Sequence, residues 1–148
     1  MSMGHMLLRV TIKLLFAPII LFGLYVQFHG DYGPGGGFQA GVIFMVAFAL
    51  HALGFGIEET KRVIPPKILP AGMALGVLIY AGTGVYTMLL GENFLDYDII
   101  QPDSHHHAGQ HIGILVVEFG VGLAVAATML QIFYVFASRE AEPQDDVW

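Results

Sequence analysis

Four long apolar runs constrain this chain more than any other feature. They cover about residues 8–28, 38–55, 68–90 and 112–137 of the 148-residue sequence. Each run is long enough to cross the hydrocarbon core of a bilayer as an α-helix, which takes about 20 residues. Hydrophobic residues make up 55% of the chain and charged residues only 12%, unlike the average soluble domain. The sequence therefore predicts an all-α integral membrane protein with four transmembrane helices, built as a single membrane domain over residues 1–148.

A glycine-dense segment separates the first two runs. We call residues 29–41, HGDYGPGGGFQAG, the glycine hinge. A helix is not expected to continue through it, because proline fixes its own φ and glycine tolerates non-helical conformations. Three consecutive glycines lose much conformational entropy on folding, so we expect other parts of the protein to hold this segment. A plain tight turn between antiparallel helices is the alternative. The predicted hinge and interface residues are Pro34, Gly35, Gly36, Gly37 and Phe38.

The third run carries a stripe of small residues on one face. Gly72, Gly76, Tyr80 and Gly84 recur at intervals of four residues, which places them on the same side of a helix. Small residues in such a stripe let a neighbouring helix approach closely. The polar segment before this run, residues 56–67, contains two prolines and is predicted to be a loop that separates the second and third spans.

The distribution of basic residues predicts how the chain is oriented in the membrane. All six lysines and arginines lie near the N-terminus, in segment 56–67 or at Arg139, and the two other connections contain none. Basic residues near the ends of spans favour the cytoplasmic side. We therefore expect both termini to be cytoplasmic and the glycine hinge to lie outside, with residues 138–148 forming an acidic tail.

The fourth run contains one carboxylate, Glu118, at roughly 9 Å inside its predicted outer end. Gly122 and Ala126 follow it at helical spacing, so the acid shares a face with small residues suited to helix packing. An ionisable group inside a span is by default a functional-site hypothesis, and Glu118 is a candidate for an ion path. The alternative is a protonated glutamate that makes one hydrogen bond to a neighbouring helix.

His51 is the second ionisable residue within a predicted span. It lies near the inner end of the second run, hence on the opposite side of the bilayer from Glu118. Together the two residues could form two stations on a proton or cation route. Equally, His51 could donate a single hydrogen bond to a neighbouring helix, as polar side chains in spans commonly do.

Four further histidines gather near the start of the fourth run. A metal site would need a defined ligand geometry and supporting contacts, which a polar connection does not predict. We therefore expect no metal site and no cofactor, and interpret the cluster as a solvated outer loop. A haem held by two histidines is the alternative, but His51 and the cluster lie at opposite depths. The clustered residues are His105, His106, His107 and His111.

Composition and motifs exclude several functions. The net charge of −6 argues against a nucleic-acid partner, and the absence of cysteine excludes disulfides and thiolate chemistry. No phosphate-binding glycine loop, nucleophile elbow or zinc-protease motif occurs, so the sequence does not predict an independent enzyme.

Two motifs in combination resemble a known family. PGGGFQAG opens the second run and VVEFGVGLAV lies within the fourth. Together they are similar to the MnhB/MrpB family, a small subunit of Mrp-type multisubunit Na⁺/H⁺ antiporters, and the similarity extends over about residues 7–137. Glu118 matches the acid in the family's later motif, and Pro34 to Phe38 match its hinge.

The resemblance implies a non-catalytic, multi-pass subunit in the cell membrane that works with other membrane subunits. Na⁺ and H⁺ would be the transported ions, in contact with the lipid bilayer. One buried acid and one histidine are too few for a complete antiport route, so we expect a partial ion path through Glu118 together with subunit interfaces. The alternatives are a structural four-span scaffold of a related membrane-bound hydrogenase-type complex, or a His-rich metal- or haem-binding membrane protein.

Overall fold

The computed structural model describes residues 3–30, 33–100 and 108–139, and all regular structure within these ranges is helical. Four helices are long and apolar enough to cross a membrane, which confirms the predicted all-α, four-span architecture. The short elements are α3 (Ile57–Val63) and the 3₁₀ turns η1 (Pro66–Ile68) and η2 (Tyr97–Ile100). The long helices are α1 (Met3–His29), α2 (Gly37–Phe55), α4 (Leu69–Leu89) and α5 (Ala108–Ala137).

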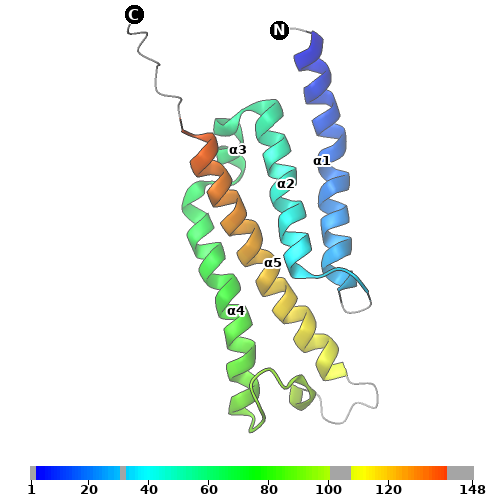
Figure 1. Ribbon diagram of the computed structural model, residues 1–148, viewed down its shortest axis with the longest axis vertical. Coiled ribbons are helices and arrows are strands. Elements are labelled where there is room, and N and C mark those ends of the chain that lie inside the picture. The colour runs from blue at the N-terminus through cyan, green and yellow to red at the C-terminus, as the bar shows by residue number, and fades with distance from the viewer. Residues whose placement is uncertain (1–2, 31–32, 101–107, 140–148) are drawn as a thin grey trace, which may run out of the picture.

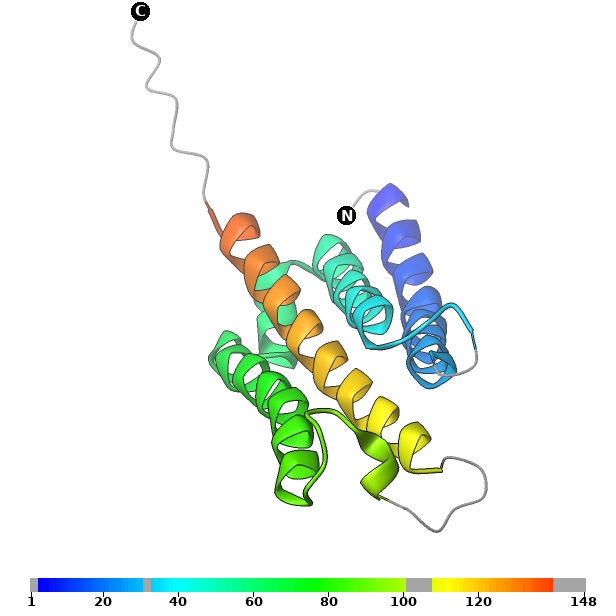
Figure 2. The same ribbon diagram turned by 60° about the horizontal axis from the view of Figure 1, so that its bottom comes forward.

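The four long helices lie side by side in the order α1, α2, α5, α4 (Figures 1 and 2). α5 is central, because it packs against α2 on one side and α4 on the other, whereas α1 packs mainly against α2. Successive long helices alternate in direction, so α1 starts and α5 ends at the same end of the bundle. This arrangement suits an even number of spans, while the cytoplasmic location of the termini stays a prediction.

The helix boundaries differ from the predicted runs mainly at the N-terminal ends of α1 and α5. α1 begins at Met3 and continues through Pro18, and α5 begins at Ala108, one turn before the predicted position. Within the predicted acidic tail, only residues 138 and 139 belong to the described part of the chain.

One helix was not predicted. Residues 57–63, expected to be a loop, form α3, which ends just before Pro65. Two acidic residues occupy its first turn and two basic residues its last, an arrangement that complements the helix dipole. They pair at a spacing of three residues, with Lys61 2.9 Å from Glu58 and Arg62 2.6 Å from Glu59. These exposed pairs sustain a short helix that apolar periodicity alone does not reveal.

The buried core lies where α2, α4 and α5 meet, at the end of the bundle near α3. Leu69, Ala127, Leu130 and Tyr134 are buried there. The Tyr134 hydroxyl lies within hydrogen-bonding distance of the carbonyls of Thr60, at 3.3 Å, and of Ile64, at 3.1 Å, which ties α5 to α3. Large apolar side chains elsewhere remain exposed, as expected for helices that face lipid or other membrane subunits.

α4 and α5 approach each other closely at glycines. A Cβ atom added to Gly76 would lie 2.5 Å from the Gly120 carbonyl oxygen, and one added to Gly120 would lie 2.8 Å from the Gly76 carbonyl oxygen. Gly72 faces Ala127 in the same contact. Gly84, the last glycine of the predicted stripe, instead accommodates the ring of Phe94 from the connection that follows α4.

The connection after α4 folds back onto the helices. The buried Thr87 hydroxyl lies 2.9 Å from the Gly84 carbonyl and 3.0 Å from the Asn93 carbonyl, and it accepts the Leu95 N–H. Tyr97 of η2 packs over Gly113 of α5. Burial, and to a smaller extent the nearby Tyr80, raises the pKa of the Tyr97 hydroxyl above its usual value.

Candidate functional site

The connection between α1 and α2 folds back on the last turns of α1. The Gly36 N–H donates to the Val26 carbonyl at 3.0 Å, and the Gly33 N–H donates to the His29 carbonyl at 3.1 Å. Gly36 has φ 113°, a conformation that residues with a Cβ rarely adopt. A Cβ on Gly35 would lie 2.8 Å from the Val26 oxygen. Positions 35 and 36 therefore require glycine for two different reasons, close approach and backbone conformation.

The start of α2 is in direct backbone contact with α5. A Cβ on Gly37 would overlap the Glu118 carbonyl oxygen, and it would lie 2.9 Å from the Gly122 nitrogen. One turn later, a Cβ on Gly41 would lie 2.7 Å from the Gly122 carbonyl oxygen. Gly37 and Gly41, four residues apart on α2, thus allow α5 to approach more closely than any larger residue would permit.

The Glu118 carboxyl group lies against the glycine hinge. A Cβ on Gly36 would be 2.7 Å from Oε1 of Glu118, and a Cβ on Gly30 would be 2.6 Å from Oε2. Glu118 is itself half-buried. The two motifs that the sequence singled out separately, the glycine hinge and the acid of the fourth span, therefore form one site. Phe38, by contrast, is 62% exposed and points away from the packed interior.

This site lies well inside the length of α5. Glu118 is about three turns from Ala108, the first residue of α5, which corresponds to roughly 15 Å along the axis. The end of α1 and the start of α2 lie short of the corresponding ends of α4 and α5 (Figure 1). Irregular backbone at membrane depth is tolerated only where protein buries it or where it lines a water-filled cavity. The N-terminal end of α2, which has no side-chain cap, is electrostatically favourable for an anionic group.

Gln27 is a further polar residue in this region, and sequence reasoning missed it. Its side chain on α1 is only 4% exposed. Its Oε1 would lie 2.6 Å from a Cβ on Gly122, so it contacts α5 one turn beyond Glu118. Its Nε2 has no hydrogen-bond partner among the described residues. The sequence feature that indicates it is a single glutamine near the end of an apolar run. Like an acid within a span, such a residue is a candidate for a polar contact inside the protein.

His51 lies far from Glu118, toward the other end of α2. Its Nδ1 is 2.8 Å from the hydroxyl of the fully buried Thr60. The Thr60 hydroxyl also lies 3.1 Å from the Gly56 carbonyl oxygen, within hydrogen-bonding distance. His51 stacks on Phe55 with ring centroids 4.7 Å apart. The imidazole thus joins α2 to α3, and the structure does not bring it together with Glu118.

The predicted histidine cluster lies mostly outside the described residues. His105, His106 and His107 belong to the range that the structure does not describe, and His111 is exposed in the first turns of α5. Among residues 3–30, 33–100 and 108–139, no group of three histidine, cysteine, aspartate or glutamate side chains is arranged to hold a metal ion.

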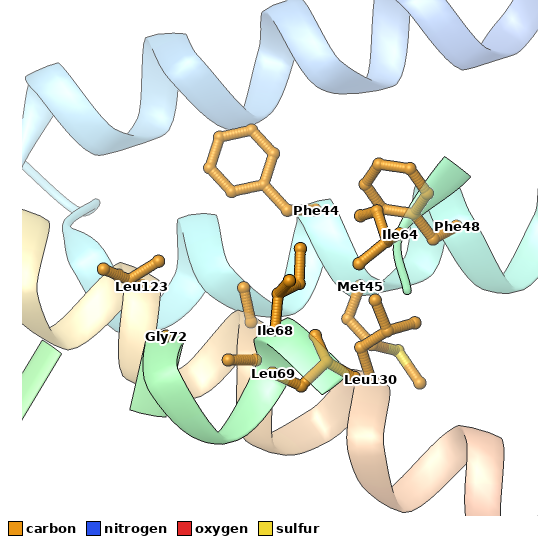
Figure 3. A pocket seen from close by; sticks show the side chains of 11 residues that line it. Phe44, Met45, Phe48, Ile64, Ile68, Leu69, Gly72, Leu123 and Leu130 are labelled. Carbon is orange, nitrogen blue, oxygen red and sulfur yellow. The ribbon is translucent and has the colours of Figure 1, made fainter. Parts of the chain in front are cut away.

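An apolar hollow of about 200 Å³ lies between α2, α4 and α5 (Figure 3). Phe44, Leu69, Leu123 and Leu130 are among its lining residues, and Gly72 forms part of its wall. None of its lining residues is ionisable. This hollow suits an apolar group such as a lipid chain and offers no ligand for an ion.

Comparison with known proteins links this architecture to one family. Residues 7–131 match a family model described as "Domain related to MnhB subunit of Na+/H+ antiporter". Proteins called "Putative antiporter subunit mnhB2" from Staphylococcus aureus strains Newman, USA300 and COL are 38% identical over 97 residues. This alignment covers 64% of the chain and 67% of each relative. The chain therefore belongs to the MnhB family of multi-pass membrane proteins, which are antiporter subunits rather than enzymes.

Proposed function

We propose that this chain is a non-catalytic subunit of a multisubunit monovalent cation:proton antiporter in the cell membrane, and that Glu118 forms part of its ion path. The observation that carries the proposal is the placement of the Glu118 carboxyl against Gly30 and Gly36, about three turns from the start of a helix long and apolar enough to cross a membrane. Family membership supports the antiporter assignment. Na⁺ and H⁺ are the proposed transported ions.

The surroundings of Glu118 favour exchange over a purely structural role. Gly30 and Gly36 bring backbone rather than side chains against the carboxyl group. The N-terminal end of α2 stabilises negative charge at the same place. A carboxylate whose charged form is stabilised by the dipole of a helix can take up and release a proton.

The chain does not supply a complete transport route. His51 is engaged with Thr60 at the other end of α2, and roughly 20 Å of helix separates it from the hinge. Antiport needs continuous relays and alternating access. We therefore assign the remaining steps to other membrane subunits of the complex.

Replacement of Glu118 by glutamine tests the proposal, because it removes the charge and keeps the shape. We expect Na⁺/H⁺ exchange in vesicles containing the assembled complex to fall about a hundredfold, within the range for a positioned proton-transfer group. The matched control is Glu92→Gln, which changes an exposed acid in the connection after α4. Full exchange by an intact Glu118→Gln complex would show that Glu118 is not part of the path.

Purification from the native membrane in mild detergent tests the partnership. Native gel sizing and mass spectrometry are expected to show the chain in a large assembly with several other multi-span subunits. Recovery of the chain alone, or as a small homo-oligomer, would contradict the antiporter assignment.

A purely structural scaffold is the second candidate, and the many exposed large apolar side chains favour it, because they can pack against other membrane subunits. Under this alternative, Gly76→Leu abolishes assembly, whereas Glu118→Gln leaves both assembly and exchange unchanged. The exchange assay on the Glu118 variant therefore separates the two functions.

A further inference from the structure

Two basic residues of α1 lie beside one aromatic ring at the end of α2. The guanidinium carbon of Arg9 and Nζ of Lys13 are each 5.7 Å from the centroid of the Phe55 ring, within the range of cation–π attraction. Nε of Arg9 also donates a hydrogen bond to the Gly54 carbonyl at 2.9 Å. Because Arg9 and Lys13 are four residues apart, both side chains leave the same face of α1. This face therefore brings positive charge to the end of α2.

A hollow of about 290 Å³ lies beside the same ring, between α1, α2 and α3, and we call it the basic hollow. Its lining residues are Lys13 and His51, which are polar, and Ile12, Phe16, Phe55 and Val63, which are apolar. Nδ1 of His51 is engaged by Thr60, which leaves Nε2 as the ring nitrogen available to a ligand. Lys13 and Val63 are exposed, so the hollow can be reached from outside the bundle. It combines a polar, cationic edge with apolar walls.

The basic hollow lies where a membrane surface is expected. α1 starts and α2 ends at the same end of the bundle, beside α3 (Figure 1). After Phe55 and a single glycine, the chain continues as α3, which has two acidic residues in its first turn and two basic residues in its last. Charged side chains are costly in hydrocarbon, so we expect α3 to lie among the lipid headgroups or in the water beyond them. The end of α2 is then level with the headgroups.

The charge of Lys13 has no carboxylate partner in the described part of the chain. The ion pairs found there lie within α3, whose two acids are engaged by bases of the same helix at 2.9 and 2.6 Å. The acid inside α5, Glu118, lies against the glycine hinge at the other end of α2. Positive charge beside an apolar hollow complements a ligand that joins a phosphate group to hydrocarbon chains, and basic pockets between membrane helices bind such headgroups.

We propose that the basic hollow binds an anionic phospholipid. Its phosphate pairs with the Lys13 ammonium and accepts a hydrogen bond from Nε2 of His51, and its acyl chain runs along Phe16 and Val63. Free phosphate fits less well, because most of the lining is apolar and makes no contact that an inorganic ion can use. The lipid connects α1, which packs mainly against α2, to both α2 and α3. This inference does not depend on the proposed role of Glu118.

Native mass spectrometry of the full-length chain tests the site. The chain is purified in mild detergent and supplied with equal amounts of dioleoylphosphatidylglycerol, which carries a net negative charge, and dioleoylphosphatidylcholine, which carries none. We expect the chain to retain about tenfold more phosphatidylglycerol than phosphatidylcholine, since two basic residues lie at the site. In Lys13→Gln the retained phosphatidylglycerol should fall about fivefold, the effect of one basic residue on an anionic headgroup.

Three further variants separate the site from general charge attraction. Lys13→Arg keeps the charge and is expected to keep binding. Val63→Trp fills the hollow from a position that is 58% exposed, keeps every charge, and should lower retention as much as Lys13→Gln. The matched control is Lys67→Gln, which removes an exposed lysine of η1 that does not line the hollow and should leave retention unchanged.

Equal retention of the two lipids by the original chain would overturn the inference, as would equal retention of phosphatidylglycerol by Lys13→Gln and Lys67→Gln. Displacement of the bound lipid by excess inorganic phosphate would show a site for the free ion instead. Cross-linking of Lys13 to a carboxylate of another subunit in the assembled complex, with no lipid bound, would show that a protein occupies the hollow.

Discussion

Both sides of α5 are closely packed, but they differ in chemistry. Toward α4, Gly76 and Gly120 bring two backbones together among apolar neighbours. Toward α2, Gly37 and Gly122 do the same, but the contact continues into the Glu118 carboxyl, the glycine hinge and Gln27. Close glycine packing alone therefore does not indicate a site. What distinguishes the α2 side is the start of α2, which has no side-chain cap and lies against a polar side chain well inside the length of α5.

The largest effect is expected from Gly37→Ala. The added Cβ overlaps the Glu118 carbonyl oxygen, and the backbone of either α2 or α5 has to move. We expect a loss of about 3 kcal/mol in folding free energy, at the upper end for an overpacked interior, together with loss of exchange in any complex that remains. Thermal unfolding of the purified chain in detergent and vesicle exchange assays measure the two losses.

Gly76→Ala tests the opposite side of α5. Its Cβ would lie 2.5 Å from the Gly120 carbonyl oxygen, so we expect a loss of about 2 kcal/mol in the same unfolding measurement. Complexes that still assemble should exchange ions at the normal rate, because no polar group of the site is disturbed. Loss of exchange in an intact Gly76→Ala complex would show that the two sides of α5 do not differ in function.

Thr60→Val tests whether the polar contact at the other end of α2 is structural. The substitution keeps the shape and removes the hydroxyl that His51 contacts, at a fully buried position. We expect a loss of about 1.5 kcal/mol in folding free energy and unchanged exchange. Thr83→Val, which removes only a bond to the Ile79 carbonyl within α4, is the control with a smaller effect. A large loss of exchange in an intact Thr60→Val complex would instead indicate that His51 takes part in the ion path.

The smallest effect is expected from Gly82→Ala. Among the described residues, nothing outside the neighbouring backbone of α4 lies within 4 Å of the place that its Cβ would fill, although this glycine occurs in the same helix as Gly76. Alanine favours helix over glycine by roughly 0.5–1 kcal/mol, so the melting temperature should stay the same or rise slightly. A marked destabilisation of the assembled complex would mean that Gly82 packs against another subunit. Native gel sizing would detect the loss of that subunit.

The sequence predicts the spans well, because a span requires only a run of about 20 apolar residues, and the length and hydropathy of a run are local properties. It also predicts a break at the glycine hinge, since proline and glycine act locally on the backbone. The helix α3 was missed because its stability comes from charge pairs rather than from apolar periodicity. The partner of Gly84 was missed because Phe94 belongs to a connection with no regular pattern.

The site itself depends on contacts between distant parts of the sequence. Glu118 and the glycine hinge were each recognised, but no local pattern indicates that Gly30 and Gly36 meet that carboxyl group. Gln27 drew no attention, because one glutamine near the end of an apolar run resembles an interfacial residue until its burial is known. His51 was recognised as ambiguous, and its partner proved to be a threonine on a helix that was not predicted.

The order of the helices along the chain has a consequence for biosynthesis. α1, the glycine hinge and α2 are translated before α5, so the backbone that receives the Glu118 carboxyl precedes that carboxyl into the membrane. An acid that enters lipid alone is unfavourable, and the cost is smaller for an acid that enters beside backbone already placed to contact it. A circularly permuted chain that delivers α5 first would lose this protection and is expected to insert poorly, even though the finished bundle would contain the same contacts.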